Sequence, residues 1–437
     1  MIKKNRAMRY FSTRDTKKNK NFFSLKEAAT KGLAPDGGLF MPEYIPQVDM
    51  KIVEELYKKS YSEMALYLAG LFFGDDVEPQ RLKEAVESAY DFPIRLNSPA
   101  KDVCTLELFH GPTYAFKDFG ARFMGQMMGI LNDSDEVIVL TATSGDTGSA
   151  VANGFHGVKG VKVVVLYPAD KISPLQEAQM TTLHGNIYPL KVNGTFDDCQ
   201  RMVKSMFADE SLRKKINITS ANSINILRWI PQSFYYFYGL CAWRELTGKE
   251  SPEVVVPSGN YGNLTAGMLA RRMGLPIRGF VAASNANDVI PEFLKSGEYR
   301  PRPSVQTVAN AMDVGAPSNY ERMMSLCNGQ IDELRREVRG FSASDEKIVE
   351  TIKEVEKAHN YLSCPHSAVG YSAAKELNVD GFWLSTAHAA KFGEVTERAT
   401  GKKPELPENM RNMLSRERIF TPIAANDEEL KKYLLEV

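Results

Sequence analysis

The stretch Val254-Val255-Val256-Pro257-Ser258-Gly259-Asn260-Tyr261-Gly262-Asn263 joins a short β-branched run to a loop that contains two glycines. An earlier stretch repeats this pattern, because Val137-Ile138-Val139-Leu140 leads to the loop Ser144-Gly145-Asp146-Thr147-Gly148-Ser149. A helical pattern follows each loop, from Leu264 and from Ala150. Each stretch therefore predicts a strand, a loop and a helix in succession. In open α/β sheets such loops, at the carboxyl ends of strands, are where ligands bind.

Other apolar and β-branched runs alternate with helical patterns over most of the chain. This alternation is typical of βαβ units, which build parallel sheets with helices on both faces. Near the N-terminus residues 52–59 and 62–71 have helical patterns, and a C-terminal helix is expected over 426–436 with Asn426 or Asp427 as its cap. The further expected strands are 161–166, 187–190, 277–282 and 381–384.

The composition is that of a globular protein, with 43% hydrophobic and 25% charged residues. Lys plus Arg and Asp plus Glu both number 54, so the net charge gives no reason to expect a nucleic acid or an anionic membrane as partner. No apolar run approaches the roughly 18 residues of a membrane span. At 437 residues the chain is too long for one ordinary core.

The cysteines and the N-terminus indicate in which cellular compartment the protein is expected. The five cysteines form no CxxC pair, which argues against a disulfide framework or structural zinc and favours a reducing compartment. The basic N-terminus, with Lys3, Lys4, Arg6 and Arg9, lacks the apolar segment of a secretory signal. We interpret it as a few extra residues ahead of Met8, and expect a cytoplasmic protein.

The loop at 258–263 is suited to an anion. Gly259 and Gly262 allow backbone N–H groups to point at a ligand, the following helix adds partial positive charge, and Asn260 and Asn263 offer side-chain donors. The loop is neither a Walker A motif nor a dinucleotide fingerprint, since the Lys-Ser/Thr pair and the third glycine are missing. On spacing alone, an ordinary strand–helix turn remains open.

The earlier loop offers several hydroxyl groups, from Thr143, Ser144 and Thr147, and the carboxyl group of Asp146. Such side chains suit a carboxylate, a phosphate or a cofactor hydroxyl. A third polar segment, Ala221 to Arg228, follows a probable strand, and its Ser223, Asn225 and Arg228 suit a phosphate or a carboxylate. Either segment could equally be a polar turn or cap.

Lys117 lies in the segment His110-Gly111-Pro112-Thr113-Tyr114-Ala115-Phe116-Lys117-Asp118-Phe119-Gly120. A Gly-Pro turn opens a helix there, and a cation near a helix N-terminus is unfavourable. Desolvation by Phe116 and Phe119 also favours the neutral, nucleophilic amine. These arguments alone do not single Lys117 out among the many lysines. The six histidines show no metal-ligand spacing, and no GxSxG serine-hydrolase motif is present.

Together these segments resemble the long form of the threonine synthase family over nearly the whole chain. The resemblance rests on motifs in matching order: LAPDGGL at 33–39, the 110–120 segment, TATSGDTG at 141–148, PSGNYGN at 257–263, ANAMDV at 309–314 and Thr386-Ala387-His388. Two small departures are Tyr261, where phenylalanine is frequent, and Ala389, where proline is frequent.

The resemblance implies a fold-type-II pyridoxal-phosphate (PLP) enzyme, similar to tryptophan synthase β. Lys117 matches the lysine that forms a Schiff base with PLP. Thr386 matches the hydroxyl residue beside the pyridine nitrogen. The expected phosphate loop is Gly259, Asn260, Tyr261, Gly262 and Asn263; the expected substrate ligands are Thr143, Ser144, Asp146 and Thr147, with Ser223, Asn225 and Arg228 for the substrate phosphate.

The implied reaction converts O-phospho-L-homoserine and water to L-threonine and phosphate. Lys117 would remove and return protons, and no metal, nucleic acid or membrane is needed. One alternative is a phospho-lyase on the same fold, which releases 2-oxobutyrate and ammonia. A second is a non-catalytic relative that only binds phosphorylated ligands, although the presence of Lys117 argues against it. We expect a monomer or a homodimer.

The expected architecture is α/β, with two open, mostly parallel twisted sheets and a mainly helical N-terminal domain. The expected divisions are an N-terminal domain at 1–97, a catalytic region at 98–410 with a large domain (about 98–136 and 216–410) and a small domain (about 137–215), and a tail at 411–437 whose helix packs on the large domain.

Overall fold

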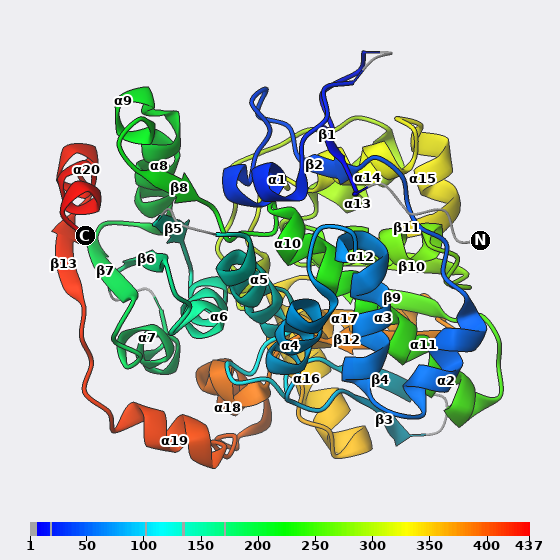
Figure 1. Ribbon diagram of the computed structural model, residues 1–437. Helices are drawn as coiled ribbons and strands as arrows, with labels where there is room; N and C mark the ends of the chain where they lie inside the picture. Colours follow the sequence, from blue (N-terminus) through cyan, green and yellow to red (C-terminus); the bar gives the residue numbers. More distant parts are fainter. Residues whose placement is uncertain (1–6, 18–19, 101–102, 133–135, 170–171) are drawn as a thin grey trace.

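A five-stranded sheet and a six-stranded sheet, with an N-terminal layer of helices, make up the computed structural model of the chain (Figure 1). Residues 7–17, 20–100, 103–132, 136–169 and 172–437 are described. The basic residues Lys3, Lys4 and Arg6 lie outside them. No helix in this described part is long and apolar enough to cross a membrane. The expected mixed α/β architecture is confirmed.

The five-stranded sheet is parallel throughout and has the order β13-β7-β6-β5-β8. Its central strands read as nearly continuous apolar runs because both of their faces are covered by helices. The strands are β5 (Val137–Ala142), β6 (Val161–Pro168), β7 (Ile187–Asn193), β8 (Asn217–Thr219) and β13 (Thr421–Ala424), and the flanking helices are α6 (Asp146–Phe155), α7 (Pro174–Thr181), α8 (Phe196–Ala208) and α9 (Glu210–Arg213).

The six-stranded sheet has the order β11-β10-β9-β12-β4-β3 and is parallel except for the β3–β4 pair. Strands far apart in the sequence are neighbours in its middle, where β12 pairs with β9 on one side and β4 on the other. The strands are β3 (Arg95–Ala100), β4 (Val103–Glu107), β9 (Glu253–Pro257), β10 (Gly279–Ser284), β11 (Val338–Ser342) and β12 (Gly381–Ser385).

The remaining helices surround this sheet or connect its strands, except α19, which packs on α7 of the other sheet (Figure 1). They are α5 (Lys117–Leu131), α10 (Ile226–Trp229), η1 (Ile230–Ser233), α11 (Phe234–Thr247), α12 (Gly262–Arg272), α13 (Val289–Ser296), η2 (Asn310–Met312), α14 (Tyr320–Leu326), α15 (Ile331–Glu337), α16 (Asp345–His359), α17 (Pro365–Glu376), η3 (Ala389–Phe392), α18 (Gly393–Thr400) and α19 (Glu408–Leu414).

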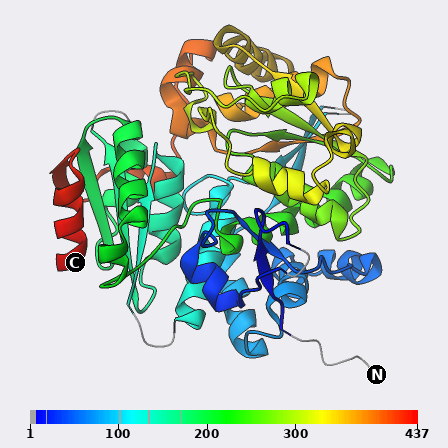
Figure 2. The same cartoon turned by 90° about the horizontal axis from the view of Figure 1, so that it is seen from above.

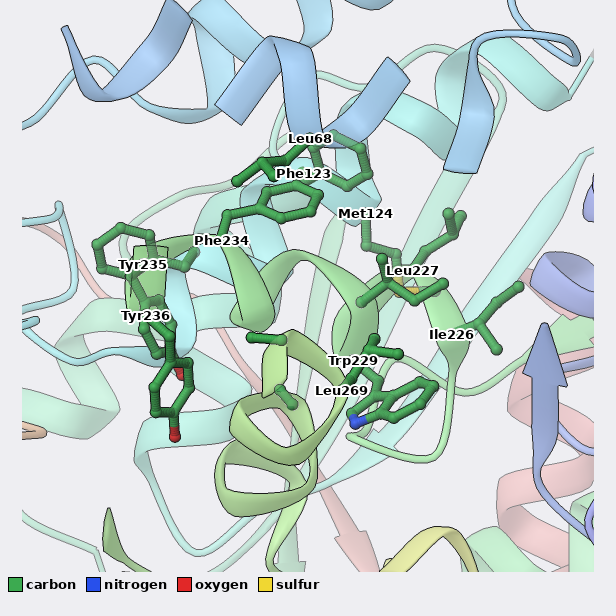
Figure 3. Packing of buried hydrophobic residues seen from close by; sticks show 14 of the residues in the cluster. Leu68, Phe123, Met124, Ile226, Leu227, Trp229, Phe234, Tyr235, Tyr236 and Leu269 are labelled. Carbon is green, nitrogen blue, oxygen red and sulfur yellow. The ribbon is translucent and has the colours of Figure 1, made fainter. Parts of the chain in front are cut away.

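The N-terminal layer contains the antiparallel pair β1 (Tyr10–Ser12) and β2 (Phe40–Pro42) and the helices α1 (Leu25–Lys31), α2 (Met50–Tyr57), α3 (Tyr61–Phe73) and α4 (Pro79–Ala89). Ser24 and Glu27 form the capping box at the start of α1 that their spacing predicts. Leu68 of α3, Phe123 of α5 and Phe234 of α11 meet in one buried cluster, so this layer shares a core with the catalytic region (Figure 3).

The C-terminal tail corrects one expectation. Strand β13 pairs with β7 of the five-stranded sheet, and α20 (Asp427–Glu436) packs on the same sheet, where Leu430 and Leu434 are buried with Met202. The tail was expected on the large domain, but it lies on the outer side of the smaller sheet (Figure 2). The physical reason is that β7 would otherwise expose an unpaired edge.

The strands predicted within 137–140, 161–166, 187–190, 253–256, 277–282 and 381–384 are confirmed as β5, β6, β7, β9, β10 and β12. The probable strand ahead of the 221–228 segment is confirmed as β8. Six strands were not predicted: β1, β2, β3, β4, β11 and β13. Each is short or interrupted by polar residues, and β11 (VRGFS) has a largely exposed pattern that gives little periodic signal. Asn426 caps α20 as expected.

Candidate active site

Three neighbouring strands of the six-stranded sheet deliver the main site segments. The loop after β4 leads to Lys117, Thr386 directly follows β12, and the loop after β9 carries Gly259. Because β4, β12 and β9 are parallel and adjacent, their carboxyl ends lie side by side. The crevice at such an edge is where open α/β sheets bind ligands.

Backbone hydrogen bonds fix the Lys117 loop to the segment after β12. The N–H of Phe116 donates to the carbonyl of Thr386 at 2.8 Å, and the N–H of His388 donates to the carbonyl of Tyr114 at 3.1 Å. Tyr114 takes a positive φ of 57°, which lets the loop turn into α5. These contacts bring Lys117 and Thr386 together although they are far apart in sequence.

Lys117 is the first residue of α5 and is partly exposed. Desolvation by the surrounding protein lowers the pKa of its amine; the carboxylate of Asp146 opposes this, and the cations of Lys391 and Arg228 add to it. The amine lies 5.7 Å from the centre of the Phe116 ring. This environment favours the neutral amine, the form that attacks a carbonyl carbon and accepts a proton.

Lys391 forms a buried ion pair that the sequence did not reveal. Its amine lies 2.8 Å from Asp146 Oδ1 and donates to the carbonyl of Thr113 at 2.7 Å, and its side chain is fully buried. Burial alone would raise the pKa of Asp146, but the cations of Lys391 and Lys117 hold it well below its usual range. Asp146 is thus a fixed carboxylate between two lysines.

The phosphate loop is a backbone cradle. A Cβ atom at Gly259 would lie 2.6 Å from Met312 Cα, and one at Gly262 would lie 2.9 Å from Ser223 Cβ, so neither position accepts a side chain. Tyr261 holds a left-handed φ of 58° just before α12 and is itself buried, with its hydroxyl bonded to Ser284.

The two asparagines of this loop differ in what they leave free. The Asn260 side chain is engaged, since its Nδ2 donates to Ser223 Oγ at 2.8 Å and its Oδ1 accepts from the Ser318 N–H at 2.6 Å. Asn263 accepts from the hydroxyls of Tyr235 and Tyr236, yet its Nδ2 is buried without a partner in the described chain. Asn263 therefore keeps a donor for an anion.

The substrate-facing loop after β5 belongs to the other sheet. Thr143 is buried, and its hydroxyl accepts from the N–H groups of Gly145 at 2.9 Å and Gly148 at 2.8 Å, so it shapes the loop. Ser144 and Thr147 are partly exposed, and no hydrogen bond of their hydroxyls is found within the described residues. They remain free to meet a ligand, while Asp146 is engaged with Lys391 and with Gln176 at 3.0 Å.

Asn225 is one of the three residues expected to bind the substrate phosphate, and for this residue the expectation is wrong. Its Nδ2 donates to the carbonyls of Ala29 and Ser220, and its Oδ1 accepts from the N–H of Leu227, so the fully buried side chain braces α10. A polar residue before a helix supplies such a cap as readily as a ligand contact. We do not retain Asn225 as a ligand.

Arg228 and Ser223 keep groups that could meet an anion. Arg228 is buried, donates to the carbonyl of Ala221, and leaves Nε without a partner in the described chain. Burial lowers its pKa to about 10. Ser223 is partly exposed and lies beside Gly262 of the phosphate loop.

Thr386 is buried, and its N–H donates to Ser367 Oγ at 3.0 Å. Its own hydroxyl makes no hydrogen bond with the part of the chain that is described. Next to it, His366 accepts from the N–H of Ala311 through Nε2 at 3.1 Å, and burial lowers its pKa to about 4. The imidazole ring of His366 is therefore neutral at its place near Thr386.

Sequence reasoning missed Lys391, Gln176 and His366 as residues of this region. Only Lys391 left a signal, because it lies in the same post-strand segment as Thr386. The others reach the site from helices or helix starts whose packing no local pattern encodes.

These residues fit pyridoxal phosphate on observations of this chain alone. The phosphate needs backbone donors with no side chain in the way, as at Gly259 and Gly262, and the spare donor on Asn263 adds to them. The aldehyde needs a neutral lysine, which Lys117 provides, and the ring nitrogen needs a free group such as the Thr386 hydroxyl.

Comparison with known proteins identifies the family. The model for pyridoxal-phosphate-dependent enzymes matches residues 95–382, the threonine synthase N terminus matches 9–90, and the threonine synthase C-terminal model matches 367–434. Threonine synthase from Escherichia coli is 43% identical over 391 residues, 89% of this chain and 90% of that protein.

Solved structures agree. PLP-bound threonine synthase from Brucella melitensis matches with a TM-score of 0.91 at 32% identity over 98% of this chain and 99% of that one. Yeast threonine synthase matches with a TM-score of 0.90 at 33% identity over 99% of both chains. PLP is thus the cofactor, and the activity is that of a PLP-dependent lyase that forms threonine. The chain belongs to the threonine synthase family.

Proposed function

We propose that the chain converts O-phospho-L-homoserine and water to L-threonine and phosphate, with Lys117 as the catalytic base. The observation that carries the proposal is that a desolvated amine at Lys117 and the glycine loop at Gly259 and Gly262 follow β4 and β9, the two strands that pair with β12 on either side. A PLP enzyme whose substrate is a phosphate ester needs two anion sites, and spare donors lie both on the phosphate loop and at Arg228.

PLP, when bound, supplies an electron-withdrawing ring that stabilises negative charge at the substrate carbon atoms next to the amine. The residues proposed to hold it are Lys117, Thr386, the backbone of Gly259 to Gly262, and Asn263. Asn260 contributes by keeping the loop in shape, because its side chain is already engaged with Ser223 and Ser318.

Lys117 is proposed to move the protons. Its amine would remove the proton at Cα of the substrate and then serve proton transfer at Cβ. Asp146 holds a negative charge close by and stabilises the protonated amine between these transfers, while Lys391 keeps Asp146 ionised. The hydroxyls of Ser144 and Thr147 are proposed to bind the substrate, and Arg228 is proposed to bind its phosphate.

A competing outcome is elimination of phosphate without addition of water at Cβ, which would release 2-oxobutyrate and ammonia. The test is to incubate the PLP-loaded protein with O-phospho-L-homoserine and to measure threonine, 2-oxobutyrate and phosphate. We expect threonine and phosphate in equal amounts. Accumulation of 2-oxobutyrate without threonine would overturn the proposal.

Lys117→Ala tests the proposed base. We expect loss of the absorbance band of the bound cofactor and a fall in threonine formation of at least about 10²–10⁴-fold, the usual contribution of a general base. Lys162→Ala, at a surface lysine paired with Glu136, is the matched control and should leave both unchanged. Retention of the band in the Lys117 variant would contradict the assignment.

We further propose that the domains are 1–97, a large domain of about 98–136 and 216–410, and a small domain of about 137–215 that carries the tail 411–437. The protein is proposed to be cytoplasmic, since its five cysteines are all buried and unpaired. It is proposed to be a monomer or a homodimer, which sedimentation of the PLP-loaded protein will distinguish.

A further inference from the structure

Thr113 is a buried residue of the loop that carries Lys117, and hydrogen bonds hold it from three elements. Its N–H donates to Asp118 Oδ2 at 2.9 Å, and its hydroxyl donates to Asp118 Oδ1 at 2.6 Å. Its carbonyl accepts from Lys391 Nζ at 2.7 Å and from Gln179 Nε2 at 3.1 Å. Every polar group of Thr113 is therefore engaged.

The bonds between Thr113 and Asp118 close the segment that contains Lys117. Asp118 is fully buried in the first turn of α5, directly after Lys117. Gly111 lies against this carboxylate, because a Cβ atom there would lie 2.5 Å from Asp118 Oδ2. Burial raises the pKa of Asp118 to about 6, and the hydrogen bonds from Thr113 oppose this rise. The carboxylate thus depends on Thr113 for its donors, and the two residues together fix the start of α5.

The carbonyl of Thr113 joins this loop to both sheets. Lys391 follows β12 of the six-stranded sheet, whereas Gln179 lies on α7, which flanks the five-stranded sheet. A carbonyl oxygen has two lone pairs, and these two donors occupy both of them. The loop of Lys117 is therefore attached to the two sheets at one oxygen atom.

Gln179 makes this bond although its other amide atom is left unsatisfied. The residue is 1% exposed, and its Oε1 is buried without a hydrogen-bond partner among the residues described. A carbonyl can only accept, so the atom of Gln179 that faces Thr113 must be the NH₂ group. A buried acceptor without a partner lowers stability, and native proteins contain few of them. An apolar side chain of similar length would avoid this loss, so the amide points to a role at Thr113.

We propose that Gln179 and Asp118 are positioning residues for Lys117, and that both act through Thr113. The inference rests on the proposed function, because it takes Lys117 as the residue that binds PLP and moves the protons. Asp118 fixes the start of α5, and Gln179 fixes the carbonyl end of the same loop. Loss of either contact displaces the amine of Lys117 from the atoms it serves, while the loop at 258–263 keeps its shape.

The experiment measures the reactivity of Lys117 separately from substrate binding. Apoprotein is mixed with PLP, and the rate at which the absorbance band of the bound cofactor appears reports the reaction at Lys117. The PLP-loaded enzyme gives kcat and the KM for O-phospho-L-homoserine. We expect Thr113→Val, which is close in shape but lacks the hydroxyl, to lower the rate of band formation and kcat about tenfold to a hundredfold, with KM near the wild-type value.

Conservative and combined variants identify the group that acts. Thr113→Ser keeps the hydroxyl and should recover most of both rates. Asp118→Ala removes both acceptors of Thr113, so it should lower the rates at least as much as Thr113→Val. The double variant should lose less than the two single losses combined, because the second substitution acts on a contact that is already broken.

Gln179→Met separates positioning from stability. Methionine has a similar length and removes both the bond to Thr113 and the unsatisfied oxygen, so the free energy of unfolding in urea should change little. The rate of band formation and kcat should nevertheless fall. Thr351→Val is the matched control, because this buried hydroxyl donates to the carbonyl of Lys347 within α16 at 2.7 Å. It should keep both rates.

Three results would overturn the proposal. They are wild-type rates in Gln179→Met, a Thr113→Ser variant as slow as Thr113→Val, and rate losses that follow the order of the losses in unfolding free energy. If Thr113→Val does not fold, Gln179→Met alone decides. Wild-type protein that forms no threonine would count against the proposed function instead, while the rate of band formation would still test the positioning of Lys117.

Discussion

At the scale of single residues, the site is set by which ionisable groups the fold removes from water. Lys117 faces one carboxylate, Asp146, and two further cations, Lys391 and Arg228, and the desolvation of its amine is the largest influence on its pKa. Because the cations are themselves buried, their fields act through a medium of low polarity and are little screened by salt. The neutral amine is therefore a property of the folded chain.

His366 gives the clearest pH dependence at this scale. Burial lowers the pKa of His366 to about 4. In the unfolded chain this histidine takes up a proton near pH 6.5, whereas in the folded chain it stays neutral until the pH falls to about 4. Stability from the neutral ring is complete above about pH 6.5 and is lost as the pH falls through about 4. We expect the free energy of unfolding to drop over this window by on the order of 3 kcal/mol from His366.

Urea unfolding of wild type and His366→Gln between pH 4 and 7.5 checks this prediction. The variant should lose less stability on acidification, because glutamine can still accept from the Ala311 N–H but does not titrate. His156→Gln, at an exposed histidine, serves as the control. A constant difference between wild type and His366→Gln at all pH values would contradict the prediction.

At the scale of elements, the decisive units are strand, loop and helix. Strand β9 and helix α12 flank a loop whose glycine positions must lack side chains. The positive φ of Tyr261 sets the shape of this loop. The tyrosine hydroxyl is anchored to Ser284, so this residue contributes a buried contact in addition to its backbone.

Gly259→Ala tests the loop. The new Cβ would meet the backbone of Met312 at 2.6 Å, which cannot move as a side chain can, so the loop must shift. We expect PLP affinity to fall roughly tenfold or more, the effect of losing a hydrogen bond to a charged group. Absorbance titration of the apoprotein measures it.

Gly70→Ala is the matched control. Gly70 lies within α3 and nothing stands within 4 Å of the added Cβ, so its variant should keep the wild-type affinity for PLP. It should also be more stable by about 0.5–1 kcal/mol, since alanine favours a helix over glycine. Equal PLP affinities in the two glycine variants would count against a backbone cradle.

At the scale of the whole molecule, the site lies where the two sheets meet. Asp146 follows a strand of the five-stranded sheet, whereas Lys391 and Lys117 follow strands of the six-stranded sheet. The Lys391–Asp146 ion pair therefore ties the two sheets together across the site. Gln179 of α7 adds a second tie by donating to the carbonyl of Thr113 at 3.1 Å.

Lys391→Met removes the cation and leaves Asp146 buried. We expect a loss of about 3–5 kcal/mol in the free energy of unfolding, the usual effect of breaking a buried pair from one side. The double variant with Asp146→Asn should recover part of the loss, because no charge then remains unpaired. Chemical denaturation of the apoproteins measures both.

Lys391→Met also has a spectroscopic consequence. Losing a neighbouring cation raises the pKa of Lys117, so reaction of the apoprotein with PLP should require a higher pH than in the wild type. The surface pair variant Lys249→Met, whose lysine bonds Asp380, should change neither property. An unaltered pH dependence of PLP incorporation in Lys391→Met would show that the pair acts on stability alone.

The sequence by itself determined the alternation of strands and helices, the two glycine loops, and, through its ordered motifs, the resemblance that singled out Lys117 and Thr386. These features are local, because periodicity and loop composition are properties of neighbouring residues. Strands β5, β6, β7, β9, β10 and β12 were found for this reason, whereas short or polar strands such as β3, β11 and β13 were not.

Only the tertiary structure decided which polar groups remain free. Asn225 and Asn260 looked like donors in the sequence, yet packing engages them with the backbone of Ala29 and with Ser223. Lys391 looked like one lysine among many, yet the fold buries it on Asp146. Hydrogen bonds between segments distant in sequence depend on how strands are ordered within the sheets, and that order follows from the burial of the whole core.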